Sequence, residues 1–171
     1  MINRLNHAVL YVRDAERSAR FYEENLGFRR IDEYGSVPNG AFLRAAGSTN
    51  DHDLALFGIG TDAGDSLAGR TTVGLYHLAW EVDTLADLQG FADKLSAVGA
   101  MVGATDHGTT RAVYAKDPDG IEFELTWIIP RDLLTDTDTP AMRPLNLQAD
   151  IARFGADTIS GVGISRPAPA A

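Results

Sequence analysis

The stretch that decides the fold runs Asp117-Pro118-Asp119-Gly120-Ile121-Glu122-Phe123-Glu124-Leu125-Thr126-Trp127. Its first four residues are typical of a tight turn, because proline presets the second turn position and glycine accepts a positive φ. The residues that follow alternate between polar and apolar, which predicts a β-strand over residues 121–129. Glu122, Glu124 and Thr126 then share one face of this strand, opposite an apolar face. Two carboxylates on one face indicate that it lines a polar or metal-containing cavity.

Upstream of this strand, the sequence predicts the same order of elements twice. The first set of strands is expected at about residues 5–12, 28–34, 40–46 and 53–59, and the second at about residues 75–83, 101–106, 111–116 and 121–129. A helix follows the first strand of each set, at residues 15–26 and at about residues 85–98. Gly27 and Gly99 stop these helices, because glycine readily adopts the left-handed conformation.

The two sets are copies of one βαβββ unit. Three positions of the first strand reappear at a constant offset of 70 (77 − 7 = 70), so that Leu5, His7 and Val12 correspond to Leu75, His77 and Val82. Element order, residue spacing and helix stops all repeat, which indicates an internal duplication. The expected fold class is α+β, with two modules at about residues 3–59 and 73–129 inside one domain of residues 1–130.

Composition narrows the classes of partner. The 171 residues include 24 acidic and 15 basic ones, for a net charge of −9, and lysine occurs only at Lys94 and Lys116. Binding to nucleic acid is therefore not expected. No apolar run approaches the roughly 18 residues that cross a membrane, and the N-terminus lacks a signal-peptide core, so we expect a cytoplasmic protein. Because cysteine is absent, any metal must be held by histidine and carboxylate side chains.

Residues 131–171 form a C-terminal extension of different character. Residues 131–144 are rich in Asp, Thr and Pro and predict an irregular crossing, residues 145–154 predict a short helix, and residues 166–171 predict a frayed end. The extension is expected either to cover the mouth of a site or to dock on a second subunit.

Histidine placement points to a metal site. His7 and His77 occupy equivalent positions in the two modules, and duplicated modules that share a core bring equivalent strands together about a pseudo-twofold axis. With Glu124 added, the set is two imidazoles and one carboxylate, which suits Fe(II), Mn(II), Zn(II) or Ni(II). A facial arrangement of three such ligands leaves positions open for substrate and O₂. Glu122 is the better candidate for an ordinary salt-bridged strand residue.

These features resemble the vicinal oxygen chelate superfamily, which includes glyoxalase I, extradiol ring-cleaving dioxygenases and bleomycin- and fosfomycin-resistance proteins. The resemblance covers about residues 3–129, and it implies a curved mixed sheet around a metal site. It is closer to the extradiol dioxygenases, because residues 52–56 resemble their His-x-Leu-Ala segment, and Asp106-His107-Gly108, Tyr114 and residues 117–124 resemble the segment that ends in the carboxylate ligand. The members with the best-known chemistry carry four βαβββ units, and this chain has two.

The resemblance implies a role for each residue. His7, His77 and Glu124 would hold a metal, Fe(II) first with Mn(II), Ni(II) or Zn(II) as alternatives, and a catechol would chelate it through both hydroxyl oxygens while O₂ takes an open position. His52 would act as base when the catechol binds and as acid later, since imidazole exchanges protons near neutral pH. Tyr114 would hydrogen-bond the substrate oxygen and His107 would orient substrate or product.

Ordinary structural roles compete with these assignments. Tyr114 could be a core aromatic and His107 a loop residue that caps a backbone group. Trp80 and Trp127 are at least as well explained as core residues as by a role in the pocket. A homodimer is expected from the open sheet edges and from two-unit relatives.

The number of ligands separates the branches of the superfamily. Glyoxalase-like members add a carboxylate on the last strand of the first repeat. Counting back from Glu124 by the repeat offset, with a slip of two residues either way, reaches Leu54, Leu56 or His52. If His52 is not a ligand, an open metal face favours catechol and O₂ chemistry. The alternatives are a glyoxalase- or epimerase-like lyase or isomerase, or a metal-free drug-binding protein.

Overall fold

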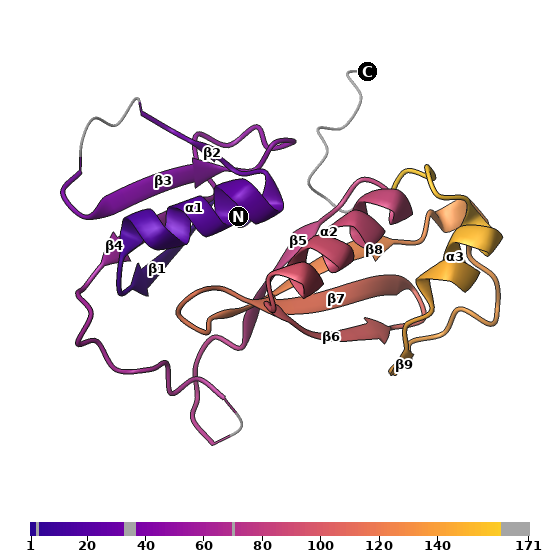
Figure 1. The fold of residues 1–171 in the computed structure, drawn as a ribbon. Coiled ribbons are helices and arrows are strands. Elements are labelled where there is room, and N and C mark those ends of the chain that lie inside the picture. The colour runs from indigo at the N-terminus through magenta and orange to yellow at the C-terminus, as the bar shows by residue number, and fades with distance from the viewer. Residues whose placement is uncertain (3, 33–36, 70, 162–171) are drawn as a thin grey trace. The chain divides into compact units, whose positions relative to one another are not determined.

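The computed structural model describes residues 1–2, 4–32, 37–69 and 71–161. The chain forms two compact units, residues 1–67 with 117–121 and residues 68–116 with 122–171. Each unit contains a strand, a helix and three further strands in that order, indigo to purple in the first unit and magenta to orange in the second (Figure 1). The α+β class and the two βαβββ modules are therefore confirmed.

The first unit is a four-stranded mixed sheet with one helix. Its elements are β1 Ala8–Val12, α1 Ala15–Leu26, β2 Arg29–Arg30, β3 Gly40–Arg44 and β4 Leu54–Gly58. The strand order is β1-β4-β3-β2, with β1 parallel to β4 and the other pairs antiparallel. One face of the sheet packs on α1, whose buried residues follow helical spacing: Ala15, Ser18, Ala19, Tyr22, Asn25 and Leu26.

Helix α1 begins and ends where the sequence predicts. The Asp14 side chain accepts hydrogen bonds from the amides of Glu16 and Arg17, which satisfies two donors of the first turn. Gly27 ends the helix with φ of +72°, in the left-handed region that a β-carbon disfavours.

The second unit repeats the topology and extends it. Its elements are β5 His77–Glu81, α2 Leu85–Ala97, β6 Met101–Asp106, β7 Thr110–Lys116, β8 Glu122–Ile128, β9 Arg143–Pro144 and α3 Leu147–Phe154, with a short 3-10 helix at Arg131–Leu133. The order is β5-β8-β7-β6-β9, and β5 is parallel to β8 as β1 is to β4. Helix α2 starts with a capping box between Thr84 and Asp87 and ends one residue before the predicted Val98.

The predicted alternation along β8 is confirmed. Phe123, Leu125 and Trp127 are almost completely buried, so Trp127 is a core residue. Glu122 and Glu124 lie on the opposite face, yet their side chains keep only 17% and 12% of their exposure. A carboxylate this enclosed needs a partner, which indicates that this face is a site.

The turn at residues 117–121 belongs to the first unit. Asp117 accepts hydrogen bonds from the amides of Asp119 and Ile121, and Gly120 has φ of +82°, which confirms the expected turn. Asp119 accepts from the Arg13 amide and guanidinium and from Arg17. The turn is thereby fixed to the start of α1, and β8 begins at the next residue.

The C-terminal extension packs on the second unit. β9 pairs with β6, α3 packs on α2, and the amides of Ala86 and Ser160 donate to Ala156 and Asp83. Helix α3 confirms the predicted helix at residues 145–154, although it begins two residues later. The predicted frayed end at residues 166–171 lies outside the described residues.

Strand ends are the main errors of the sequence prediction. The first strand begins at Ala8 and not at Leu5, because its partner β4 begins opposite Ala8. The strand predicted at residues 28–34 is two residues long, and residues 33–34 lie outside the described part. None of the described helices has the length and apolar character needed to cross a membrane.

Candidate functional site

The register of β8 brings the predicted site residues of the second unit together. β5 and β7 flank this strand, so that Glu122 lies opposite His77 of β5 while Glu124 lies opposite Tyr114 of β7. Paired residues of neighbouring strands point to the same face of a sheet. One imidazole, one phenol and two carboxylates therefore share the open face of this sheet.

His77 and Glu124 are in direct contact. The His77 Nε2 atom lies 3.1 Å from Glu124 Oε2, diagonally across β5 and β8. The other ring nitrogen, Nδ1, is buried, makes no hydrogen bond among the described residues and lies 4.0 Å from Glu122 Oε1. Glu122 thus pairs with a neighbouring strand residue, as the sequence suggested, and that neighbour is His77 of this cluster.

Tyr114 and His107 form a second contact in the same unit. The Tyr114 hydroxyl lies 2.7 Å from His107 Nε2, and the Tyr114 ring centroid lies 5.6 Å from that of His77. Burial raises the pKa of the Tyr114 phenol well above its ordinary value, and the negative charge of Glu124 raises it further. Both effects favour the protonated phenol, and the His107 side chain contacts Tyr114 as well as lying in the hairpin loop.

In the first unit, His7 and His52 lie together. Their ring centroids are 4.4 Å apart, and the Phe42 ring meets His52 edge-on at 5.3 Å. His7 is exposed, with Nδ1 2.7 Å from Asn6 Oδ1, whereas His52 is buried. His52 precedes β4 and does not lie on it. The two predicted histidines of the first module are thus neighbours that differ in access to solvent.

Strand register identifies the first-module counterpart of Glu124. In the second unit Ala79 pairs with Glu124, and in the first unit the equivalent Val9 pairs with Ala55. The offset is therefore 69 at this strand (124 − 55 = 69). Ala55 is a different position from the three that sequence counting reached, and it has no donor atom. The first module therefore offers no carboxylate at the position of Glu124.

The donor atoms present suit a divalent metal. Two ligands about 2.1 Å from one ion and at right angles to each other lie about 3.0 Å apart, close to the observed 3.1 Å between His77 and Glu124. Among the residues that the structure describes, no three His, Asp or Glu side chains gather in a metal-binding group. Within the second unit, His77 and Glu124 are therefore a possible pair of metal ligands.

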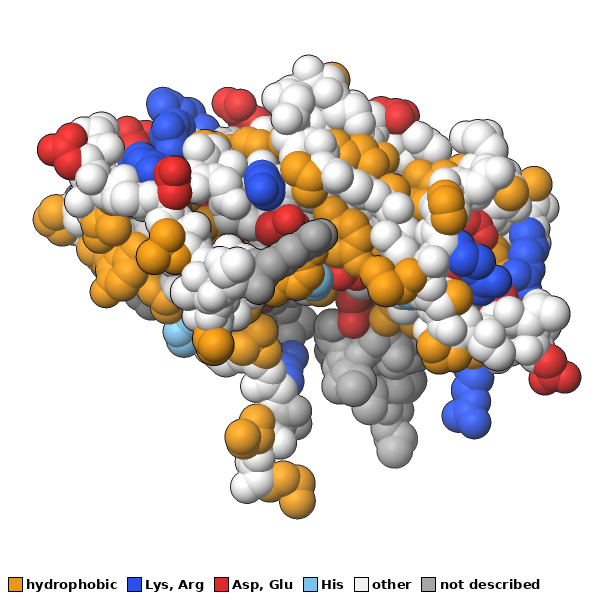
Figure 2. Space-filling model, turned by 90° about the horizontal axis from the view of Figure 1, so that it is seen from below, with side chains coloured by type: hydrophobic (Ala, Val, Ile, Leu, Met, Phe, Trp, Pro, Cys, Tyr) orange, Lys and Arg blue, Asp and Glu red, His pale blue; other side chains and the backbone are white. Residues whose placement is uncertain are grey.

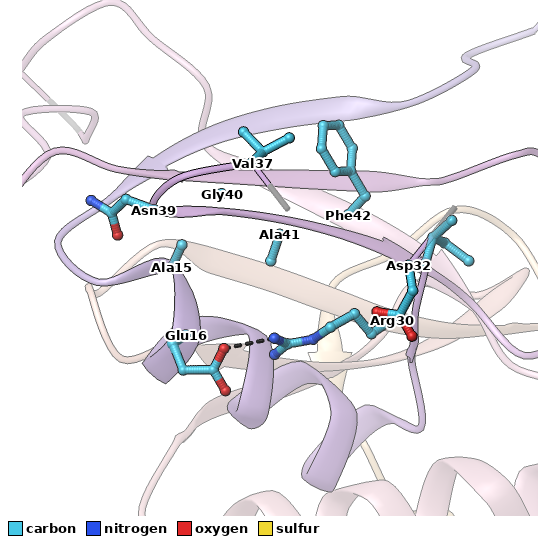
Figure 3. A pocket seen from close by; sticks show the side chains of 10 residues that line it. Ala15, Glu16, Arg30, Asp32, Val37, Asn39, Gly40, Ala41 and Phe42 are labelled. Atoms are coloured by element: carbon cyan, nitrogen blue, oxygen red, sulfur yellow. Dashed lines mark hydrogen bonds and ion pairs between the residues drawn. The ribbon is translucent and has the colours of Figure 1, made fainter. Parts of the chain in front are cut away.

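A separate hollow of about 470 Å³ lies in the first unit between α1 and β3. Figure 3 shows Glu16 and Arg30 pointing toward each other along it, and their side chains pair at 2.6 Å. None of the predicted site residues lines it. On the face drawn in Figure 2, lysine and arginine side chains lie in separate small groups among acidic and apolar ones.

Comparison with known proteins agrees with the fold. Residues 4–125 match the family model described as the Glyoxalase/Bleomycin resistance protein/Dioxygenase superfamily. The chain belongs to this family. The C-terminal extension lies outside the matched residues of the superfamily model.

Relatives within the superfamily differ in activity. The chain is 31% identical over 159 residues to biphenyl-2,3-diol 1,2-dioxygenase 3 of Rhodococcus globerulus, covering 84% of this chain and 80% of the relative. A manganese-dependent 2,3-dihydroxybiphenyl 1,2-dioxygenase of Geobacillus genomosp. 3 is 26% identical over 134 residues, 76% of this chain, and the chain spans 38% of its length. A probable lactoylglutathione lyase of Synechocystis sp. is 31% identical, covering 71% of this chain and 92% of the relative.

A solved structure of the superfamily contains a metal. The fosfomycin resistance protein FosX from Listeria monocytogenes, complexed with Mn(II) and sulfate, is 25% identical with a TM-score of 0.54. The match covers 73% of this chain and 90% of that protein. Metal-dependent relatives thus occur in more than one branch of the superfamily.

Sequence reasoning missed two features of the site. It took Glu122 for an ordinary salt-bridged residue and did not predict that its partner is His77, although strict alternation already placed Glu122 on the face of Glu124. It also missed the contact between His107 and Tyr114, because that contact depends on the hairpin geometry between β6 and β7. The seven-residue separation of His107 and Tyr114 gave no signal by itself.

Proposed function

We propose that the chain is a metal-dependent extradiol-type dioxygenase that cleaves the ring of a catechol-like substrate with O₂. The observation that carries the proposal is the open face of β8, where the His77 and Glu124 pair lies beside the Tyr114 and His107 pair. The biphenyl-2,3-diol dioxygenase of Rhodococcus supports it, because this chain covers most of that relative's length.

The proposed ligands are His77, Glu124 and His7. A bound divalent ion, Fe(II) first with Mn(II) as the alternative, would supply an electrophilic centre for the two substrate oxygens and for O₂. Glu122 is the proposed partner of the second nitrogen of His77. Histidine ligands usually donate their second ring N–H to a carboxylate. The Nδ1 atom of His77 makes no hydrogen bond among the described residues and lies 4.0 Å from Glu122 Oε1, so a small approach of Glu122 would let it accept from that nitrogen.

The remaining residues handle protons and orientation. Tyr114 keeps its proton at neutral pH because burial and Glu124 raise its pKa, so it donates a hydrogen bond to a substrate oxygen. His107 holds the Tyr114 hydroxyl through Nε2. His52, buried beside His7, accepts a proton from the catechol and returns it later.

A glyoxalase-like lyase is the second candidate, and the Synechocystis relative favours it. Its usual four-ligand set needs a carboxylate on the last strand of the first module. The equivalent position is Ala55, so this strand supplies no carboxylate there. A three-ligand metal keeps more positions open, which suits a chelating diol and O₂ better than it suits a lyase.

The test is a metal analysis of protein purified without oxygen, followed by oxygen-electrode traces with a panel of catechols after Fe(II) or Mn(II) is added. The proposal expects oxygen uptake with a new yellow ring-cleavage absorbance, lost in Glu124→Ala. Bound Ni(II) or Zn(II), no oxygen uptake and turnover of a glutathione hemithioacetal would establish the lyase instead. Protein that binds no metal under any condition would contradict both and leave the metal-free binding protein.

A further inference from the structure

Residues 138–154 of the C-terminal extension, here named the strap, lie against the hairpin that carries His107. This hairpin, residues 106–110, joins β6 to β7. The Ala141 amide donates to the His107 carbonyl at 3.0 Å, and β9 in the strap pairs Arg143 with Asp106. The strap therefore bonds the backbone of His107 and of the residue before it.

The backbones of hairpin and strap touch at Gly108. This glycine is buried with φ of +86°, and a β-carbon on it would overlap the carbonyl oxygen of Thr139. Only glycine fits there, because any side chain would both strain the backbone and push the strap away. The contact shows that the hairpin and the strap are fitted to each other.

The buried side chain of Arg111 on β7 contacts both the hairpin and the strap. This side chain keeps 4% of its exposure, and Nη1 donates to Asp106 Oδ1 at 2.8 Å and to the Gly108 carbonyl at 3.0 Å. Its Nε lies 2.8 Å from Asp150 Oδ1 on α3. One carboxylate comes from the hairpin and one from the strap. Removing one partner of a buried guanidinium leaves an unpaired buried charge, which strongly destabilises the fold. The pairs with Asp106 and Asp150 therefore keep the hairpin and the strap together around Arg111.

The strap has its own anchors. Asp138 at its start pairs with Arg153 near its end at 2.6 Å, and the Phe154 ring lies 5.4 Å from that of the buried Trp127. The strap is thus closed on itself and fixed to β8. It can hold the hairpin at a constant position relative to the face that carries Glu124.

We propose that the strap positions His107, so that its imidazole stays hydrogen-bonded to Tyr114 on the open face of the sheet. Ala141 and Asp150 act as positioning residues that do not touch the substrate. This inference rests on the proposed function for the role of His107 toward substrate, while the positioning itself can be tested without any turnover. The superfamily model does not match the extension. In this proposal the extension nevertheless contributes to the site by positioning His107.

The experiment uses the full chain with ¹⁵N-labelled histidine. Ala141→Pro removes the N–H that bonds the His107 carbonyl, and Asp150→Asn removes the strap's charge beside Arg111. Ser160→Ala is the matched control, because it removes one side-chain hydrogen bond between the extension and the sheet, the one that the Ser160 hydroxyl accepts from the Ile128 amide. It leaves the contacts of Ala141 and Asp150 in place. The ring resonances of His107 are assigned with His107→Gln.

The proposal expects the His107 Nε2 resonance to move toward that of a free imidazole in Ala141→Pro and Asp150→Asn, and to stay unchanged in Ser160→Ala. Bound metal should be unchanged in all three, while the KM for catechol rises about 2- to 10-fold in the first two, the range expected for one lost hydrogen bond. An unchanged His107 resonance in both variants would overturn it. If Ala141→Pro does not fold, Asp150→Asn decides. Wild-type protein without catechol turnover would contradict the proposed function, and the resonances would still decide whether the strap positions His107.

Discussion

The turn at residues 117–121 provides a sharp test of how burial decides the strength of an ion pair. Arg13 binds two carboxylates, Asp119 at 3.0 Å and Asp65 at 2.6 Å. The Asp119 side chain keeps 6% of its exposure and that of Asp65 keeps 89%. We expect Asp119→Ala to destabilise the protein far more than Asp65→Ala, although the bond to Asp65 is shorter.

The magnitude follows from the donors around Asp119. Its carboxylate accepts from the Arg13 amide and Nη1, from Arg17 Nη2 and from the Ser18 hydroxyl. Breaking a fully buried pair costs about 3–5 kcal/mol. Arg13 and Arg17 keep 23% and 44% of their side-chain exposure, so both can turn toward water, and we expect about 2–3 kcal/mol. For Asp65→Ala we expect about 0–1 kcal/mol, since exposed pairs contribute little.

Urea unfolding followed by circular dichroism measures the difference. With a slope of about 2 kcal/mol per molar urea, Asp119→Ala should lower the midpoint by about 1–1.5 M and Asp65→Ala by less than about 0.5 M. Trp80 and Trp127, the two tryptophans, both lie in the second unit, so their fluorescence reports separately whether that unit unfolds in the same transition. Equal shifts for the two variants would refute the reasoning from burial.

Three further predictions concern acid stability, metal affinity and the core. The Arg153 guanidinium holds the pKa of the Asp138 carboxyl far below its usual range, against the effect of burial. The resulting stabilisation is complete above about pH 5 and is lost as the pH falls through the lower folded-state pKa, so the unfolding curves of wild type and Asp138→Asn should converge only in strong acid. Glu122→Gln should weaken Mn(II) binding about 10- to 100-fold in a titration of the metal-free protein, because the carboxylate beside His77 Nδ1 is removed. Leu88→Ala should lower the free energy of unfolding by about 2–5 kcal/mol in urea, because Leu88 on α2 is fully buried.

Much of the fold could be predicted because local signals and long-range patterns agree. Asp14 and Gly27 define α1 to the residue, since both act through the backbone of the helix they flank. Strand ends were less predictable, because a strand extends only as far as a neighbouring strand pairs with it. Leu5 is apolar and β-like in pattern, yet β1 begins at Ala8, where pairing with Leu54 starts.

The extension shows where sequence patterns stop being informative. Its helix was predictable from spacing, but the contacts of Arg111 with Asp106 and Asp150 join residues 5 and 39 positions apart (111 − 106 = 5; 150 − 111 = 39). No periodicity encodes such a contact. The buried arginine on β7 was equally hidden, because nothing in residues 110–116 distinguishes a guanidinium that faces a packed helix from one in solvent.

The proposed ligand set depends on a difference of one residue between the modules. The histidines repeat at an offset of 70, whereas the last strands pair at an offset of 69. By the same register Asp53 corresponds to Glu122 (122 − 53 = 69). The Asp53 carboxylate, however, already accepts hydrogen bonds from the Ala45 amide and from the side chains of Ser48 and Asn50. Neither first-module counterpart of the β8 carboxylates is therefore available to a metal. At these two strand positions the first module offers no free carboxylate, whereas the second offers Glu122 and Glu124 beside His77. This asymmetry favours the proposed three-ligand site over a site with a second carboxylate.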